Sequence, residues 1–281
     1  MEIKSNPAQP YATHPDYTVR MLAMWELPRR TLMRQAIEAL QLPDGSRGLD
    51  AGCGIGLQAL MLTEAVGPNG HVTGIDIASK QLAIAEEIAA SNGMSQRVKF
   101  VEASINRLPF EDDSFDWAWS ADCVGYSSGD HVHRIREMAR VVKPGGTVAI
   151  LYYSSQQLLP GYPGLEARLN ATASGIAPFV HGMKPETHFT RALGWFRAAG
   201  LDRLAAQTFV GDTHAPLSDE MREALATLIE MRWPNVESEL PQDDRDLFHR
   251  LCKPDSPDFI LDISDYYAFF TYSMFHGTAS K

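Results

Sequence analysis

Residues 48–56 read GLDAGCGIG, with glycines at Gly48, Gly52, Gly54 and Gly56. The stretch lies between a predicted short strand over 47–50 and a predicted helix over 57–66. Glycines at such a junction let the main chain turn sharply and approach a ligand with no Cβ in the way, and the first turn of the helix offers unpaired N–H groups. Taken alone, the pattern is also compatible with an ordinary tight turn between a strand and a helix.

Strands and helices alternate around this loop. Further strands are predicted over 71–76, 98–102, 115–120 and 147–153, and helices over 79–92 and 132–142. Alternation at this spacing indicates an α/β fold with a parallel sheet and right-handed crossovers. The KPGG segment, residues 143–146, is interpreted as the turn that leads into the strand over 147–153.

The regions outside this core have a different character. Residues 1–44 are predicted to form an N-terminal arm and cap helices, with Pro28 interrupting the helical pattern of 15–40. Residues 45–153 form the predicted cofactor-binding core. Residues 154–281 are predicted to supply the remaining core strands, including an aromatic strand over 266–277, and two lid insertions over about 155–188 and 213–260. The first insertion shows weak periodicity, and the second is expected to be helical.

The charge balance argues against a nucleic-acid partner. The formal net charge is −10, and the segment from Asp219 to Asp265 holds thirteen acidic and five basic residues. A phosphate backbone would be repelled there, so we expect no DNA or RNA substrate and favour a small-molecule acceptor.

Cysteine usage and hydropathy are typical of a cytoplasmic protein. The three cysteines, Cys53, Cys123 and Cys252, are far apart in the sequence and form no metal-binding motif, so neither a zinc site nor a disulfide framework is expected. No stretch of about 18 apolar residues suggests a membrane span, and the N-terminus does not look like a targeting segment. Both a monomer and a homo-oligomer stay open.

Two carboxylates strengthen the ligand interpretation of the glycine loop. Asp76 ends the second predicted strand, twenty residues after Gly56, where dinucleotide-type folds place a carboxylate that accepts ribose hydroxyls. Asp50 stands two residues before Gly52 and could either fix the loop or face the ammonium group of a ligand through bridging water. The plainer role for Asp76 alone is a helix N-cap.

Four segments in order carry a family resemblance: GLDAGCGIG (48–56), GIDIASKQL (74–82), NRLPFEDDSFDWAWS (106–120) and MARVVKPGGTVAI (138–150). The series resembles class I S-adenosylmethionine-dependent methyltransferases, and within them the group that includes the ubiquinone and menaquinone biosynthesis enzymes. The resemblance implies a Rossmann-like, seven-stranded, mostly parallel sheet with helices on both faces, an antiparallel last strand and a helical lid. It also implies S-adenosylmethionine as cofactor and methyl transfer to an oxygen or carbon of an apolar small molecule.

The same resemblance assigns site residues. The glycines would contact the methionine and ribose portion with Asp50 behind them, Asp76 would bind the ribose hydroxyls, and Ile77 would pack on adenine. Ser104 stands where the family has an Asp that contacts the adenine amino group, which leaves this contact to the Ser104 hydroxyl or to its neighbours. The implied cofactor-binding set is Asp50, Gly52, Cys53, Gly54, Gly56, Asp76, Ile77, Gln81, Ala103, Ser104, Ser120 and Ala121.

The sequence bears on three alternative functions. A nicotinamide enzyme is disfavoured because the sixth position counted from Gly52 is Leu57 and not Gly or Ala. Arsenite methylation would need several thiols, and Cys123 is the one cysteine near the expected methyl position, so a small, half-buried apolar role is favoured for it. A protein that binds the cofactor without transferring methyl stays open, since its binding motifs would be identical.

The sequence offers two candidate catalytic residues. His131 and His133 follow the fourth strand and could take a proton from a phenol or enol acceptor. Asp130, beside them, is expected to cap the helix that starts there. The acceptor, the methylated atom and the general base are not fixed by the sequence.

Overall fold

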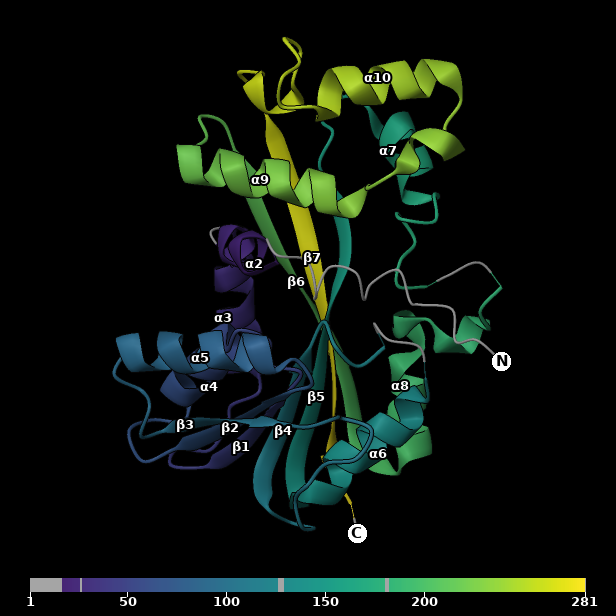
Figure 1. Ribbon diagram of the computed structural model, residues 1–281. Coiled ribbons are helices and arrows are strands. Elements are labelled where there is room, and N and C mark those ends of the chain that lie inside the picture. The colour runs from purple at the N-terminus through teal and green to yellow at the C-terminus, as the bar shows by residue number, and fades with distance from the viewer. Residues whose placement is uncertain (1–16, 26, 126–128, 180–181, 281) are drawn as a thin grey trace. The chain divides into compact units, whose positions relative to one another are not determined.

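The computed structural model describes residues 17–25, 27–125, 129–179 and 182–280. The described strands form one seven-stranded sheet in the order β3-β2-β1-β4-β5-β7-β6 (Figure 1). Their bounds are β1 Arg47–Ala51, β2 His71–Asp76, β3 Val98–Glu102, β4 Phe115–Ala121, β5 Val142–Gln157, β6 Leu201–His214 and β7 Tyr267–Ala279. Strands β1 to β5 pair in parallel, which confirms the predicted mostly parallel, Rossmann-like sheet.

Nine α-helices lie within the described residues. They are α2 Tyr17–Trp25, α3 Arg29–Ala39, α4 Leu57–Ala65, α5 Ser79–Ser91, α6 His131–Val141, α7 Pro163–Asn170, α8 Ala192–Ala199, α9 Asp219–Arg232 and α10 Gln242–Cys252. The break between α2 and α3 falls at the predicted Pro28, and the segment 213–260 is helical as expected. None of these helices is long and apolar enough to cross a bilayer. The predicted arm over residues 1–14 lies outside the described part of the chain.

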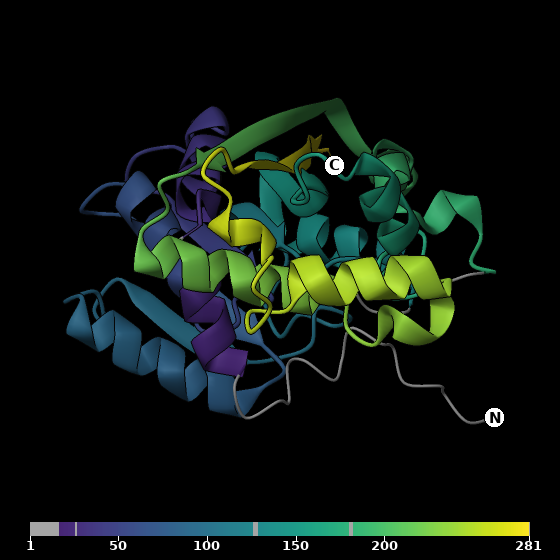
Figure 2. The ribbon, with the colours of Figure 1, turned by 90° about the horizontal axis from the view of Figure 1, so that it is seen from above.

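The chain divides into two compact units. The core unit comprises residues 33–153, 184–209 and 273–281, and the accessory unit comprises 1–32, 154–183 and 210–272. In the core unit, α4 and α5 pack on β2 and β3, while α6 contacts β4 and lies beside α8. In the accessory unit, α2 packs against α9 through the Arg20–Glu230 ion pair at 2.9 Å, and Figure 2 shows α9 and α10 roughly in line.

The strand before the glycine loop is built around a large aromatic side chain. Trp117 of β4 is 1% exposed, and its indole donates a hydrogen bond to the Ser46 hydroxyl at 2.9 Å. Gly48 of β1 pairs with Trp117, and a Cβ on Gly48 would lie 1.9 Å from the indole ring. Gly48 therefore makes room for the tryptophan, and the close packing fixes β1 against β4 directly below the loop.

The interpretation of KPGG as a turn is wrong. Lys143–Gly146 lies inside β5, where Phe115 pairs with Val142 and Trp117 already pairs with Thr147. The four residues bulge out of the strand because Pro144 has no N–H to donate and Gly145 adopts a φ of 82°. The Lys143 ammonium holds the bulge to Asp116 at 2.7 Å, so β5 starts earlier than predicted.

The segment 155–188 is also more regular than its weak periodicity suggested. Strand β5 continues to Gln157, and Pro163–Asn170 forms α7. Tertiary contacts stabilise this short helix: the Glu166 carboxylate accepts the main-chain N–H groups of Leu158 and Leu159 at 2.8 and 2.9 Å, and Arg168 forms a bidentate ion pair with Asp244.

Candidate functional site

The glycine loop, residues 52–56, is fastened to the end of β2. The main-chain N–H groups of Gly52 and Cys53 donate to the Ile75 carbonyl at 2.8 and 2.9 Å, and the N–H of Gly54 donates to the Asp76 carboxylate at 3.0 Å. Gly56 follows as the N-cap of α4 with a φ of 81°. The loop is therefore held in one conformation by the neighbouring strand before any ligand binds.

The three loop glycines are needed for different reasons. All have positive φ, and a Cβ on Gly52 would lie 2.3 Å from the Cys123 sulfur, while one on Gly56 would lie 2.8 Å from the Ala85 methyl group. A Cβ on Gly54 would meet nothing closer than the Gln81 side-chain oxygen at 3.4 Å. Packing thus requires Gly52 and Gly56, whereas the backbone at Gly54 has an open side that a ligand can approach.

Asp76 organises the loop through both carboxylate oxygens. One accepts the N–H of Gly54 and the other accepts the N–H of Ala78, each at 3.0 Å. The N-cap of α5 is Ala78, so Asp76 supports that helix start from two residues upstream. Each carboxylate oxygen can accept a second hydrogen bond, and binding of the ribose hydroxyls by Asp76 stays a prediction.

Asp50 is a buried acid whose charged form is disfavoured. It is 1% exposed, and its Oδ2 atom has no hydrogen-bond partner among the described residues. Burial, and then the negative charge of Asp76, raise the pKa of the Asp50 carboxyl to about 8. The carboxylate does not fix the loop by hydrogen bonds; it is instead a buried acceptor whose charge a cationic ligand group could compensate.

The expected adenine side combines apolar and polar groups. Ile77 leaves 68% of its surface exposed just after β2, which is unusual for a large apolar side chain. The Ala103 N–H is already bonded to the Asp76 carbonyl at 3.0 Å, so this donor is not available for adenine. The Ser104 hydroxyl accepts the Asn106 N–H at 3.3 Å, and Gln81 is buried beside Gly54.

The end of β4 meets the loop from the other side. The Ser120 hydroxyl donates to the Ala51 carbonyl at 2.7 Å, so it ties β4 to β1. Ala121 is buried, and Asp122 adopts a φ of 49° while its carboxylate accepts the Tyr153 N–H at 2.9 Å. Cys123 then lies against Gly52, which places the segment after β4 in contact with the loop.

The two candidate histidines have opposite environments. His133 is exposed, and its Nε2 atom lies 2.7 Å from the Asn106 carbonyl oxygen. His131 is 4% exposed, packs its ring on Trp195 with 4.5 Å between centroids, and has no partner for either ring nitrogen within the described residues. Asp130 caps α6 by accepting the His133 N–H at 3.0 Å, as predicted.

Arg134 is a buried charged residue beside the candidate histidines that the sequence pattern did not single out. Arg134 is 3% exposed, and its Nε donates to the Asn106 side-chain oxygen at 2.8 Å. The signal was present: positions 131, 134, 135, 138 and 141 form the buried face of α6, and a charged residue on such a face is rarely there for packing alone.

The cysteines are poorly suited to thiol chemistry. Burial is the main cause that raises the pKa of the Cys123 and Cys252 thiols to about 12, and it raises that of Cys53 further still. Thiolate is the reactive form. No group of three His, Cys, Asp or Glu side chains among the described residues could hold a metal ion.

Slow alkylation of these cysteines is therefore a prediction. In the native protein at pH 7.5, iodoacetamide should label Cys123 at least about 100-fold more slowly than in the urea-unfolded chain, because so little thiolate is present. Mass spectrometry of a labelling time course measures both rates. Rapid native labelling of Cys123 would restore the thiol-assisted alternative.

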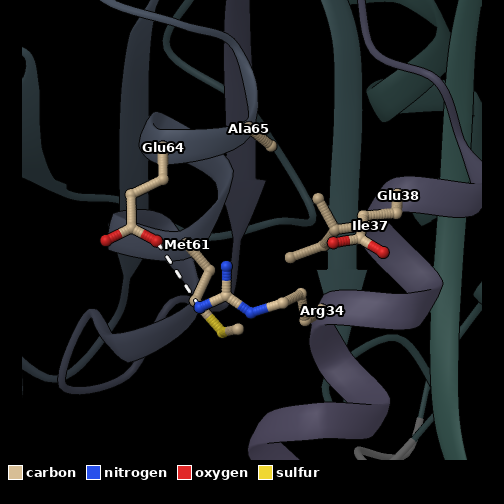
Figure 3. Close-up of a pocket in the computed structure, with 6 residues that line it drawn as sticks. All are labelled: Arg34, Ile37, Glu38, Met61, Glu64 and Ala65. Atoms are coloured by element: carbon tan, nitrogen blue, oxygen red, sulfur yellow. Dashed lines mark ion pairs between the residues drawn. The ribbon is translucent and has the colours of Figure 1, made fainter.

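A shallow surface pocket lies elsewhere in the core unit, between α3 and α4 (Figure 3). Ile37 and Met61 form its apolar part, and the Arg34 guanidinium points toward the Glu64 carboxylate at 3.7 Å. Both charged side chains are about half exposed, so the ion pair contributes little. None of the predicted cofactor residues lines this pocket.

The geometry around the loop fits S-adenosylmethionine. The buried Asp50 carboxylate has an acceptor position for the ammonium group of the methionine portion, Gly54 offers main chain without a Cβ in the way, and Ile77 offers an exposed apolar surface for a base. A dinucleotide would have a pyrophosphate at this loop, and a buried acid is a poor neighbour for it.

Comparisons with known proteins also indicate a methyltransferase domain. The sequence model of the methyltransferase domain family matches residues 42–194, more than half of the chain. Demethylmenaquinone methyltransferase of Bacillus cytotoxicus is 34% identical over 129 residues, which are 45% of this chain and 52% of that protein. The match thus spans about half the length of the curated relative.

Solved structures show the same fold. Phosphoethanolamine N-methyltransferase 2 of Haemonchus contortus, in complex with S-adenosyl-L-methionine, has a TM-score of 0.58 at 18% identity over 99% of this chain and 61% of that chain. The [4+2]-cyclase SpnF has a TM-score of 0.51 at 22% identity over 89% and 81%. At these identities the likeness concerns the fold alone. Because the family model covers more than half of its length, the chain belongs to the methyltransferase domain family, whose cofactor is S-adenosylmethionine.

Proposed function

We propose that this protein transfers the methyl group of S-adenosylmethionine to an oxygen or carbon atom of an apolar small molecule. The observation that carries the proposal is the buried Asp50 side chain, whose Oδ2 atom has no hydrogen-bond partner among the described residues, next to a glycine loop that Asp76 holds in place. Ionising such a buried acid costs free energy, and a cationic ligand group that compensates the charge explains its position.

The acceptor class rests on two supports. The curated relatives are named for demethylmenaquinone, a small apolar molecule, as the compound they methylate. The chain itself is acidic, with a net charge of −10, which disfavours a polyanionic acceptor.

The protein's part in the reaction would be to bind, orient and exclude water. When bound, the cofactor supplies a methyl group on a sulfonium, which is a strong electrophile. Asp50 would hold the methionine portion and Asp76 the ribose, so that the end of β4 and the residues directly after it, 120–123, would face the transferred group. Fixing the acceptor in line with that group is the largest contribution such a site makes.

A cofactor-binding protein that does not transfer methyl is the second candidate. The chain shares its fold with a named [4+2]-cyclase as well as with a named methyltransferase, so the fold does not separate the two. The difference has to be measured as labelled product.

Calorimetry and radiolabelling together test the proposal. S-Adenosylmethionine should bind and NADH should not, and with methyl-labelled cofactor the label should appear in the apolar small-molecule fraction of a cell extract. The Asp76→Ala variant is the control, which should form much less labelled product when the cofactor concentration is below saturation. Label in nucleic acid or protein would overturn the acceptor class, and cofactor binding without any labelled product would favour the second candidate.

A further inference from the structure

The most unusual polar side chain outside the cofactor residues is His131. It is 4% exposed, and neither Nδ1 nor Nε2 has a hydrogen-bond partner among the described residues. An imidazole without partners in the interior loses the hydrogen bonds that it would make in water. A purely structural position would be filled more stably by an apolar side chain, so the two nitrogens indicate a role in binding a polar group.

The surroundings of His131 connect it to the loop. Its ring packs on Trp195 of α8, and a Cβ on Gly125 would lie 3.5 Å from that indole and 1.9 Å from the Tyr152 hydroxyl of β5. Gly125 is two residues after Cys123, which lies against Gly52 of the glycine loop. The Tyr152 ring in turn stacks on Phe189, with centroids 5.1 Å apart. An aromatic wall thus extends from the carboxyl end of β4 to His131.

The groups around His131 disfavour the imidazolium form, so its neutral ring keeps an acceptor nitrogen. Its own helix contributes Arg134 and Asp130, and α8 contributes the uncharged Trp195. Burial, and then the positive charge of Arg134, lower the pKa of His131 to about 4, so the imidazole is neutral at neutral pH and can accept a proton. Burial and then Asp76 raise the pKa of the Cys123 thiol at the end of β4, and the positive charge of Arg134 acts against this rise.

We propose that His131 accepts the proton of the methyl acceptor and that the acceptor carries a weakly acidic hydroxyl, a phenol or an enol, on a flat ring system that packs along Trp195 and Tyr152. This inference rests on the proposed function. It selects His131 over His133, whose ring is exposed and bonded to the Asn106 carbonyl.

The step balances as a simple substitution. The O–H bond breaks and its proton forms a bond to an imidazole nitrogen, while the electron pair stays on the acceptor. The oxygen, or a ring carbon conjugated with it, forms a bond to the methyl carbon as the carbon–sulfur bond breaks, and that electron pair remains on sulfur. The imidazolium afterwards releases its proton to water. Arg134 stabilises the negative charge on the acceptor before transfer.

Two probe series test the proposal: phenols and naphthols of graded acidity, and thiophenols, which are already ionised at pH 8 and need no base. In the His131→Phe variant, which keeps a ring against Trp195, transfer to phenols should fall by about 10²–10⁴-fold, while transfer to thiophenols and cofactor affinity should change little. In His131→Ala, added imidazole should restore part of the phenol activity. In the wild type, the rate of transfer to phenols should stay constant as the pH falls well below 6.5, because the pKa of His131 is about 4.

Specific outcomes overturn it. If the His131 variants lose activity equally with phenols and thiophenols, His131 only supports the structure. If His133→Gln selectively loses phenol activity and the His131 variants do not, His133 is the proton acceptor instead. A wild-type enzyme that methylates thiophenols or amines but no phenol would refute the acceptor class while leaving the proposed methyl transfer intact. A wild-type protein that does not bind S-adenosylmethionine would instead refute the proposed function itself.

Discussion

Replacing Asp50 by Asn is expected to weaken S-adenosylmethionine binding at least about tenfold, a loss of roughly 1.4 kcal/mol, and at the same time to raise the melting temperature of the cofactor-free protein. The substitution keeps the shape of the side chain and removes its charge. The ligand's ammonium group then loses its counter-charge, whereas the cofactor-free protein no longer contains a buried acid whose Oδ2 atom has no partner among the described residues. One residue would thus oppose stability and serve binding.

The stability gain should depend on pH. The pKa of Asp50 is about 8 in the folded protein, above the ordinary carboxyl value of 3.8, so the folded chain keeps a proton that the unfolded chain releases. Stability contributed by this group is complete below pH 3.8 and is lost as pH rises through 8. The Asn variant does not titrate, so its advantage should be larger at pH 8.5 than at pH 5.5, by at least a few degrees at about 2–4 °C per kcal/mol.

Thermal denaturation at both pH values and calorimetry with S-adenosylhomocysteine measure these effects. The affinity of the wild type should rise with pH relative to that of the variant, because Asp50 becomes charged as the pH approaches 8. The ligand's own amino group titrates equally in both experiments and cancels in the comparison. Leu49→Ile, at the neighbouring buried position of β1, controls for substitution in this strand. A variant that is less stable at both pH values would show that the Asp50 carboxylate makes stabilising contacts instead.

Much of this fold could be predicted because the informative patterns are local. The alternation of apolar strands with helices around 48–56 is set by burial on a parallel sheet, and it identified β1 to β4 and the early helices within a residue or two. Positions also carried information: Asp50 and Asp76 were assigned from their spacing to the glycines, and both lie at the loop in the structure.

The sequence-based predictions failed where residues distant in the sequence determine the local structure. Pro144 and Gly145 give the same local signal in a turn as in a bulge, and only the pairing of Phe115 with Val142 shows that the strand has already begun. Helix α7 has eight residues and weak periodicity, and it depends on contacts such as Arg168 with Asp244 from α10. A one-dimensional pattern does not contain such partners.

In the site, too, the residue types were readable from the sequence, whereas their tertiary contacts were not. Sequence proposed His131 and His133 equally, since both follow β4 at similar distance. Their difference comes from tertiary neighbours: Trp195 covers one ring, and the Asn106 carbonyl lies at the other. Arg134 became a candidate through its burial, which depends on how α6 packs. Residue type gave the chemistry, and packing selected the residue.

Asp76→Ala should have the largest effect on the cofactor. The substitution removes the acceptor for the N–H groups of Gly54 and Ala78 together with the predicted ribose contact. Hydrogen bonds to a charged group contribute about 1.5–3 kcal/mol each, so affinity should fall at least about tenfold, and calorimetry with S-adenosylhomocysteine measures it. Unchanged affinity would remove Asp76 from the site.

The two roles of Asp76 can be separated with a second ligand, the 2′,3′-dideoxy analogue of S-adenosylhomocysteine. If Asp76 binds the ribose hydroxyls, their removal should weaken binding to the wild type by at least about tenfold, yet cost the Asp76→Ala variant little, and the coupling between the two changes measures the contact. If the analogue loses equal affinity with both proteins, Asp76 acts only by holding Gly54. Asp76→Asn should fall between these limits, because its amide oxygen can still accept one N–H group but its NH₂ group must face the other.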